Sequence, residues 1–268
     1  MAQRYVRIQL EAGRQCFGLY QLDHSVLLLD NAPWLGGEPT EESIAESDYQ
    51  LLAPCQPSKI IAVGRNYAAH AAEMDNTVPS EPLLFLKPPS AITADLTPVV
   101  YPPQTQRLDY EGELALVIGR VTKQVTPEVA LEQVWGYTIA NDITARDLQK
   151  QDSQWTRAKG FDGFCPLGPW VVRQIAPDTL LQTFVNEETT PRQSATITEM
   201  VFSPGEIVAY ISQIMTLYPG DVVLTGTPEG IAPLSVGDQV RVEIEGIGSL
   251  VNEIIALPAV TRSESMDE

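Results

Sequence analysis

Short apolar runs, each ended by Gly, Pro or Asp, recur along almost the whole chain and constrain its fold most strongly. Runs such as YVRIQL, VLLLD, KIIAVG, ELALVIGR, GYTIANDIT, DVVLTG and VRVEIEG have the length and the Val, Ile and Leu content of strands. The segment SPGEIVAYISQIMTL differs, because Ile207, Ile211 and either Ile214 or Met215 form one helical stripe. Since strands outnumber helices and no fixed-period repeat occurs, we expect an α+β fold dominated by mixed β-structure.

The N-terminal part is predicted to be a small β unit. Three short strands are followed, after Thr40, by EESIAESDYQLL (residues 41–52), which we expect to be a helix capped by Thr40. The connector LLAPCQPSK then contains two prolines. We therefore expect a small N-terminal β domain at residues 1–55, a large domain at 56–260 and a flexible polar tail at 261–268.

The chain is strongly acidic, with 35 Asp and Glu against 17 Lys and Arg and a formal net charge of −18. Nucleic-acid binders carry basic surfaces, so neither nucleic acid nor an anionic membrane is an expected partner. Three widely spaced cysteines, and a start (MAQRYVRIQL) without the apolar core of a signal peptide, predict a cytoplasmic location. An anionic substrate would need local positive charges in its binding site.

Carboxylates lie inside two of the apolar runs. Glu111 and Glu113, in LDYEGELALVIGR, are two residues apart and share one face of a strand, and Asp142 lies in GYTIANDIT. Buried carboxylates repel one another unless a cation lies between them, and oxygen ligands suit Mg²⁺ or Mn²⁺, with Ca²⁺ as an alternative. A second interpretation makes the glutamates a solvated strand face and Asp142 a helix cap.

The segment NYAAHAAEM is predicted to be a helix that begins after Asn66. His70 and Glu73 are three residues apart, so their side chains share one helical face. A carboxylate that accepts from one imidazole nitrogen raises the basicity of the other, and such a pair can remove a proton from water or from a C–H group. The alternative is an ordinary exposed pair that contributes little.

Candidate positive groups and donors follow the carboxylates. Arg146, Gln149 and Lys159 come soon after Asp142, and an arginine or a lysine there could bind a carboxylate or stabilise an oxyanion. Arg65 and Lys87 are weaker candidates. In LTGTPEG, the residues Thr225, Gly226 and Thr227 could offer N–H and hydroxyl donors to an acid group. Each of these side chains could equally be ordinary surface charge or part of a plain turn.

Taken together, these segments resemble the fumarylacetoacetate hydrolase family. The matching stretches are VGRNYAAHAAEM, PLLFLKPPSAI, LDYEGELALVIGR, GYTIANDITARDLQ, RAKGFDGFCPLGPWVV, SPGEIVAYISQIMTLYPGDVVLTGTPEGI and VRVEIEGIGSLVNEI, in family order. The resemblance covers roughly residues 58–256. It implies a mixed β-roll preceded by a small N-terminal β domain, and a homodimer.

The resemblance also implies roles for the candidate residues. It assigns Mg²⁺ or Mn²⁺ to Glu111, Glu113 and Asp142, and makes His70 and Glu73 the pair that activates water or moves a proton. It makes Lys159 a catalytic lysine and assigns substrate binding to Arg146, Gln149, Thr225, Gly226 and Thr227. Arg65 is a further substrate-binding candidate, on its residue type alone. The segment around residues 66–81 is similar to a lid that closes over bound ligand.

A small anionic 2-oxo or 2,4-dioxo acid is the substrate that this resemblance implies, and it would react through an enolate stabilised by the metal. Cleavage of a C–C bond, by acylpyruvate hydrolysis or oxaloacetate decarboxylation, is the first expectation. The alternative is a keto–enol tautomerase or isomerase of oxaloacetate or of a 2-hydroxy-dienoate, because FDGFCPLGP resembles the isomerase-like members. A catalytically inactive ligand-binding module is a remote third possibility.

Overall fold

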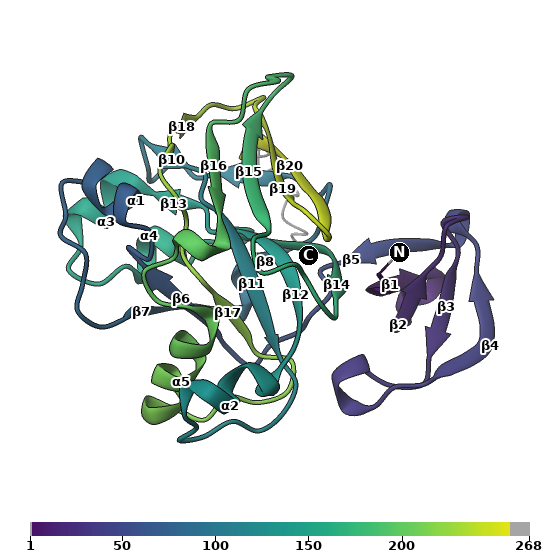
Figure 1. The fold of residues 1–268 in the computed structure, drawn as a ribbon. Coiled ribbons are helices and arrows are strands. Elements are labelled where there is room, and N and C mark those ends of the chain that lie inside the picture. The colour runs from purple at the N-terminus through teal and green to yellow at the C-terminus, as the bar shows by residue number, and fades with distance from the viewer. Residues whose placement is uncertain (1, 258–268) are drawn as a thin grey trace, which may run out of the picture.

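The N-terminal part forms a small antiparallel sheet in the computed structural model, which describes residues 2–257 (Figure 1). Its strands are β1 (Arg4–Leu10), β2 (Gln15–Tyr20), β3 (Val26–Leu29), β4 (Pro39–Ile44) and β5 (Tyr49–Leu52), with 3-10 turns η1 (Glu11–Gly13), η2 (Pro33–Leu35) and η3 (Glu46–Asp48). The three predicted strands are present, and Val6, Ile8, Val26 and Leu28 form a separate small core beneath them. The predicted tail, residues 261–268, lies outside the described residues.

The helix predicted at residues 41–52 is wrong. Strand β4 pairs with β3, and β5 pairs with β1 through partners such as Leu52 and Arg7. The Thr40 hydroxyl donates to the Leu28 carbonyl, so it serves the sheet and not a helix end. Tyr49 and Leu51, two residues apart, both pack on the N-terminal core, which is the period of a strand.

The rest of the chain extends this sheet and adds two smaller sheets (Figure 1). A 12-stranded sheet has the order β4-β3-β2-β1-β14-β12-β11-β17-β6-β7, with β5 on β1 and β8 on β14. Its further strands are β6 (Ile60–Gly64), β7 (Leu83–Lys87), β8 (Ile92–Thr93), β11 (Gly112–Ile118), β12 (Val134–Asn141), β14 (Cys165–Val172) and β17 (Val222–Leu224). Parallel pairs such as β17–β6 occur among antiparallel ones, so the predicted mixed β-structure is confirmed.

A five-stranded sheet has the order β16-β15-β19-β20-β9, and a three-stranded sheet has the order β13-β10-β18. These strands are β9 (Val99–Tyr101), β10 (Leu108–Asp109), β13 (Thr144–Ala145), β15 (Leu180–Val185), β16 (Gln193–Thr196), β18 (Pro233–Leu234), β19 (Gln239–Ile244) and β20 (Gly248–Ala256). The helices are α1 (Ala68–Glu73), α2 (Pro127–Ala130), α3 (Arg146–Gln151), α4 (Thr156–Lys159) and α5 (Pro204–Ile214), with 3-10 turns η4 (Pro89–Ala91), η5 (Leu131–Gln133) and η6 (Ile197–Glu199).

Strand β11 lies at the centre and is buried on both faces. Leu114 and Leu116 belong to the main hydrophobic core, while Ala115 and Val117 belong to a second core on the other face. This double burial explains the unbroken apolar run after Glu113. The start of β11 is therefore deep inside the protein, and any polar side chain there requires a partner.

Helix α5 has the sequence signals that predicted it. Ser203 and Glu206 form a reciprocal capping box, and Pro204 occupies the first turn. Ile207 and Ile211 are fully buried, but Ile214 is 58% exposed. Met215 packs against the main core in its place, because the backbone becomes extended there.

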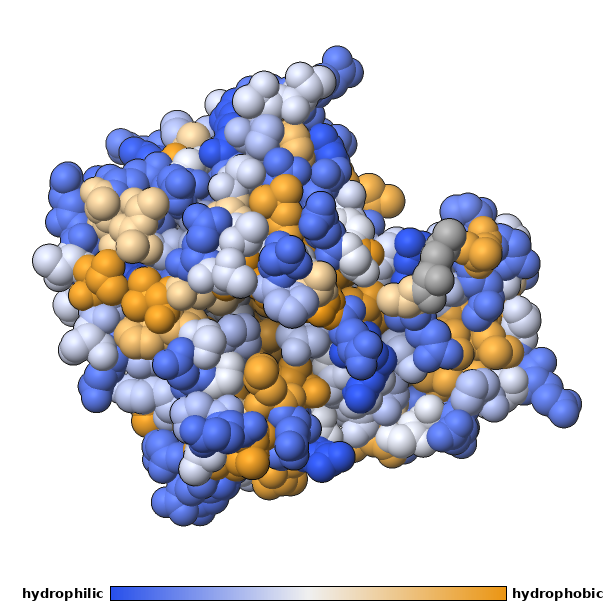
Figure 2. Space-filling model, in the orientation of Figure 1, coloured by the Kyte–Doolittle hydropathy of each residue, from blue (hydrophilic) through white to orange (hydrophobic). Residues whose placement is uncertain are grey.

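Among residues 2–257, no helix has both the length and the apolar character needed to cross a membrane. The face shown in Figure 2 is largely hydrophilic, with apolar residues gathered in separate groups.

Candidate active site

Three buried carboxylates meet where β11 begins and β12 ends. Gly112 pairs with Asn141 across these strands, so Glu111, Glu113 and Asp142 are brought together by the register. Each offers an oxygen within 4.8 Å of the others, and their exposed fractions are 5%, 1% and 0%. A solvated strand face is excluded, and Asp142 does not cap helix α3, whose N-cap position is Ala145.

Cationic side chains contact two of these carboxylates. The Lys159 ammonium lies 2.7 Å from Glu111 Oε2 and 2.5 Å from Asp142 Oδ2. Lys87, a weaker candidate from the sequence, is fully buried and reaches Asp142 Oδ1 at 2.6 Å. Burial opposes ionisation of Glu111, but Lys159 and Arg146 outweigh it and hold the pKa of this carboxyl well below its usual range.

Glu113 has no such partner: none of the Lys, Arg or His side chains in the described part of the chain forms an ion pair with it. It accepts a 2.7 Å hydrogen bond from the Gly226 N–H. Burial, Asp142 and Glu111 together raise its pKa well above the usual value. Three clustered carboxylate oxygens, one of them without a cation, fit a hard divalent metal ion.

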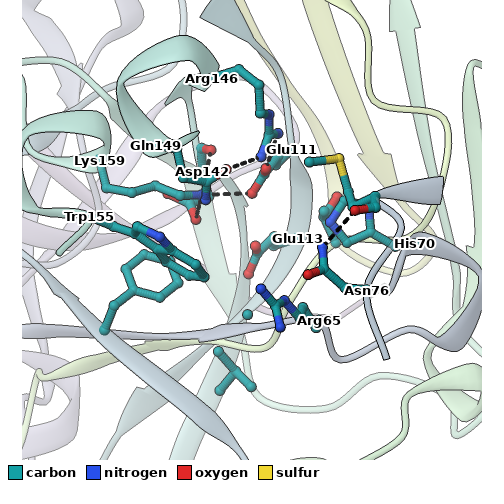
Figure 3. Close-up of a pocket in the computed structure, with 15 residues that line it drawn as sticks. Arg65, His70, Asn76, Glu111, Glu113, Asp142, Arg146, Gln149, Trp155 and Lys159 are labelled. Atoms are coloured by element: carbon teal, nitrogen blue, oxygen red, sulfur yellow. Dashed lines mark hydrogen bonds and ion pairs between the residues drawn. The ribbon is translucent and has the colours of Figure 1, made fainter. Parts of the chain in front are cut away.

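Arg146 and Gln149 lie on α3 beside the triad, as Figure 3 shows. Arg146 is buried, and its guanidinium donates to Glu111 Oε1, to Gln149 Oε1 at 2.5 Å and to Asp109 Oδ2 at 2.8 Å. The structure therefore places a cation at the carboxylates, and it shows that Arg146 is shared with Asp109, which was not a predicted site residue.

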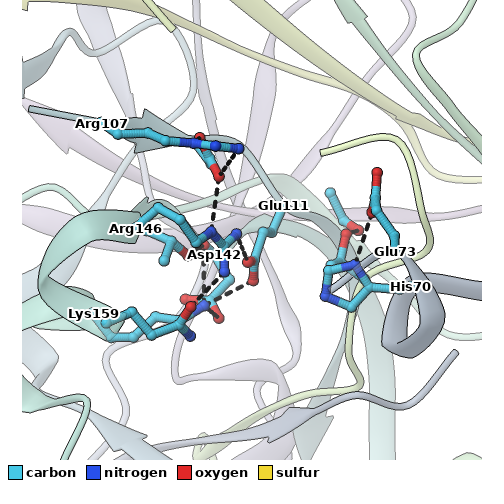
Figure 4. A network of polar contacts seen from close by, with 12 residues as sticks. His70, Glu73, Arg107, Glu111, Asp142, Arg146 and Lys159 are labelled. Carbon is cyan, nitrogen blue, oxygen red and sulfur yellow. Dashed lines mark hydrogen bonds and ion pairs between the residues drawn. The ribbon is translucent and has the colours of Figure 1, made fainter. Parts of the chain in front are cut away.

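His70 and Glu73 lie on helix α1, across from Lys159 (Figure 4). His70 Nδ1 is 3.3 Å from Glu73 Oε2, and His70 is only 6% exposed, so this is not an ordinary surface pair. The Glu73 carboxylate also accepts from the Gly230 N–H at 3.1 Å. The imidazole is thus held at the edge of the carboxylate cluster by a carboxylate that is itself anchored.

Asn66 precedes α1 but does not cap it, since the N-cap position is Tyr67. The buried Asn66 amide donates to the carbonyls of Phe202 and Thr225, and its oxygen accepts from the Phe202 N–H. Asn66 therefore ties the start of α1 to the turn after β17 and to the approach to α5.

The turn Thr225–Thr227 faces β11 and mainly satisfies internal hydrogen bonds. The hydroxyls of Thr225 and Thr227 donate to the carbonyls of Leu114 and Gly112. Gly226 has a φ of +96°, and a Cβ there would lie 2.7 Å from the Asn66 Cβ. The two hydroxyls predicted as substrate donors therefore already have partners within the protein. Of the three residues, only Thr227 lines the cavity.

The cavity at the triad has a volume of about 50 Å³. Arg65 lines it from a left-handed backbone conformation, with a φ of 58°, and forms no ion pair or hydrogen bond with another described side chain. Trp155 packs edge-on against Phe85 and forms a wall that the sequence did not identify. Cys165 lies nearby, but burial raises the pKa of its thiol to about 12, as expected for an inert cysteine.

Known proteins match both parts of the chain. Residues 59–255 match the fumarylacetoacetate (FAA) hydrolase C-terminal family, and residues 3–54 match the Rv2993c-like N-terminal family. The mitochondrial oxaloacetate tautomerase FAHD2A of Homo sapiens is 39% identical over 224 residues, which are 79% of this chain and 71% of that protein.

Two solved structures with more than 30% sequence identity to this chain share its fold. The 5-carboxymethyl-2-hydroxymuconate delta-isomerase of Mycobacterium smegmatis has a TM-score of 0.87 and 43% identity, covering 95% of this chain and 100% of that one. The fumarylpyruvate hydrolase of Pseudomonas aeruginosa, solved with Mn²⁺ and pyruvate, has a TM-score of 0.71 and 34% identity, covering 78% of this chain and 92% of that one. These matches confirm the resemblance noted in the sequence, and the chain belongs to the fumarylacetoacetate hydrolase family.

Proposed function

We propose that the protein is a divalent-metal-dependent enzyme that interconverts the keto and enol forms of a small anionic 2-oxo acid, with oxaloacetate as the first candidate. One observation carries the proposal: a buried histidine, paired with Glu73, and a buried lysine face the same carboxylate triad from opposite sides (Figure 4). Cleavage of a C–C bond is the first expectation from the residues and the family resemblance. Relatives named as a tautomerase and an isomerase support reversing that order.

Glu111, Glu113 and Asp142 would hold the metal, and we propose Mg²⁺ or Mn²⁺ because the donors are all carboxylate oxygens. When bound, such an ion withdraws electron density from the carboxylate and 2-oxo oxygens of a 2-oxo acid and makes the C3 protons more acidic. The triad can take up the two positive charges of such an ion because, among residues 2–257, no Lys, Arg or His side chain forms an ion pair with Glu113.

His70 is the proton carrier in this proposal. Its Nδ1–H donates to Glu73, which leaves Nε2 as the base that takes a proton from C3 of the keto form. Returning a proton to the C2 oxygen completes the enol, so no atom is gained or lost. Glu73 keeps the ring oriented because its carboxylate is also bound by the Gly230 N–H.

Lys159, Arg65 and Arg146 supply the positive charge that an anionic substrate needs. Lys159 directs its three protons at Glu111 and Asp142, so it contacts a substrate oxygen only by exchanging one of these partners. Arg65 forms no ion pair or hydrogen bond with another described side chain, so it is the best placed to bind a carboxylate group of the substrate.

Cleavage of a C–C bond is the second candidate function. The same His70 and Glu73 pair could deprotonate a water molecule, and the relative solved with Mn²⁺ and pyruvate is named as a fumarylpyruvate hydrolase. Decarboxylation of oxaloacetate would pass through the same enolate without water.

The deciding experiment supplies enol-oxaloacetate and acetylpyruvate to the purified protein with Mg²⁺ or Mn²⁺. Loss of the enol absorbance and release of pyruvate are followed separately, with EDTA and His70→Gln as controls. Fast loss of the enol without pyruvate, abolished by both controls, is the expected result. Pyruvate released at the rate of substrate loss would favour cleavage, and no metal-dependent reaction with either acid would contradict both candidates.

A further inference from the structure

Asp109 is a fully buried carboxylate that lies between two arginines, two residues before Glu111. Arg107 binds it with two hydrogen bonds, from Nε at 2.9 Å and from a terminal nitrogen at 3.2 Å. Arg146 Nε donates to its other side at 2.8 Å. Figure 4 shows the resulting line of charges, which runs from Arg107 through Arg146 to Glu111.

The orientation of Arg146 depends on this carboxylate. A guanidinium has five N–H donors, and three of them are directed at Asp109, Gln149 and Glu111. One donor on each terminal nitrogen is therefore left for a ligand. Backbone contacts brace the same arrangement, because β10 pairs with β13 and the Arg146 N–H donates to the Arg107 carbonyl at 2.8 Å.

We propose that Asp109 is a positioning residue that acts through Arg146. Asp109 holds the Nε edge of the guanidinium, so that Arg146 contacts the metal ligand Glu111 through one terminal nitrogen only and keeps donors for the substrate carboxylate. The part of this inference that concerns the substrate rests on the proposed function. The part that concerns Glu111 and the metal ion does not depend on which substrate the protein uses.

Loss of the Asp109 charge should weaken both metal binding and substrate binding. Without Asp109, the guanidinium is free to turn and bind Glu111 with both terminal nitrogens, so it competes more strongly with a divalent cation. This competition weakens metal binding, and the reoriented Arg146 binds the substrate less well.

The experiment compares Asp109→Asn with Asp221→Asn. Asp221 is also fully buried and paired with a lysine (Lys59, 2.5 Å), but it lies at the opposite end of β17 from Gly226. Titrating metal-free protein with Mn²⁺, by calorimetry and EPR, should show affinity reduced about tenfold in Asp109→Asn, as is typical for residues that orient metal ligands. KM should rise about tenfold with kcat within about threefold, because binding alone is affected. Asp221→Asn should lose thermal stability without either change.

Two further variants separate positioning from a merely structural role. In an Arg146→Met background, Asp109→Asn should add no further loss of Mn²⁺ affinity or of KM, because its effect passes through Arg146. Asp109→Glu keeps the charge but moves the guanidinium, so it should fold with near-native stability and raise KM. This variant decides the question if Asp109→Asn does not fold.

Additive losses in the double variant, wild-type Mn²⁺ affinity in Asp109→Asn, or wild-type KM in Asp109→Glu would overturn the positioning role. If the wild-type protein turns over no oxo acid, the proposed function fails, yet the Mn²⁺ titration still tests Asp109.

Discussion

Glu113 is the residue whose environment predicts the clearest response to substitution. Its buried carboxylate faces Asp142 and Glu111 without a cation, so its folded-state pKa is raised above that of the unfolded chain. Ionisation of Glu113 therefore removes stability as pH rises through the folded-state value. Glu113→Gln keeps an acceptor for the Gly226 N–H but does not ionise. We expect the metal-free variant to be more stable than wild type by about 1 kcal/mol or more at alkaline pH, and to gain no stability from Mg²⁺.

Thermal unfolding at pH 5 and pH 8, with and without Mg²⁺, measures both effects. The advantage of the variant should be larger at pH 8, and wild type should recover it when Mg²⁺ is added. Glu253→Gln, at an exposed position of β20 whose side chain forms no ion pair or hydrogen bond with another described residue, is the control and should match wild type throughout. A Glu113→Gln protein that is stabilised by Mg²⁺ as much as wild type would remove Glu113 from the metal site.

At the residue scale, spacing made the carboxylate triad, the His70–Glu73 pair and the cations after Asp142 candidates with open alternatives, and the family resemblance decided between them. The structure gathers the triad, His70, Arg146 and Lys159 around one cavity, and Glu73 bonds to His70. Asp109, and the role of Asn66, carried no such signal. The contacts of Asp109 with Arg146 and of Asn66 with Thr225 join residues 37 and 159 positions apart. A single buried polar residue has no periodicity, so only the folded chain reveals its partner.

At the scale of the elements, one side chain ties the start of helix α1 to the rest of the fold. Asn66 makes three hydrogen bonds that connect the start of α1 to Phe202 and Thr225. Asn66→Ala leaves these buried backbone groups without partners, which should cost at least about 2 kcal/mol. Because His70 is carried by α1, we expect faster amide exchange at residues 66–74 and a kcat reduced more than tenfold, measured by hydrogen-exchange mass spectrometry and by the enol assay.

Asn76→Ala is the matched control, since the Asn76 side chain donates to the nearby Met74 carbonyl and its backbone bond to Ala71 is kept in the variant. It should leave exchange in α1 and the stability of the protein close to wild type. Equal protection of residues 66–74 in Asn66→Ala and wild type would show that α1 is held by other contacts.

Elements with several agreeing local signals were predicted correctly, and an element with one weak signal was not. Helix α5 was predicted because capping box, proline and apolar stripe all agree. The segment 41–52 was predicted as a helix from Thr40 and its glutamates, but Ile44, Tyr49 and Leu51 find their burial on the N-terminal core only as strands. There the tertiary contacts with β1 and β3 outweigh a weak helical preference.

For the whole molecule, the distribution of charge matters more than its sum. A net charge of −18 repels anions at long range, yet Lys87, Lys159 and Arg146 are gathered around the triad and offset its three negative charges. An anionic substrate therefore meets a locally balanced site, and a bound divalent cation would tip that balance towards attraction.

The edge of the large sheet supports the last expectation, that the protein is a homodimer. Strand β7 is an outer strand of the 12-stranded sheet, and Leu86 on it is 52% exposed. Leu84, Leu86 and Met215 line one surface groove of about 340 Å³, and an apolar groove beside an open strand edge is a surface that a second copy would cover. We expect light scattering after gel filtration to give the mass of a dimer, and Leu86→Glu to shift it at least tenfold in concentration towards the monomer. Leu22→Glu, in a turn where the leucine is 78% exposed, should leave the dimer intact. A wild-type monomer, or equal effects of both substitutions, would contradict this interface.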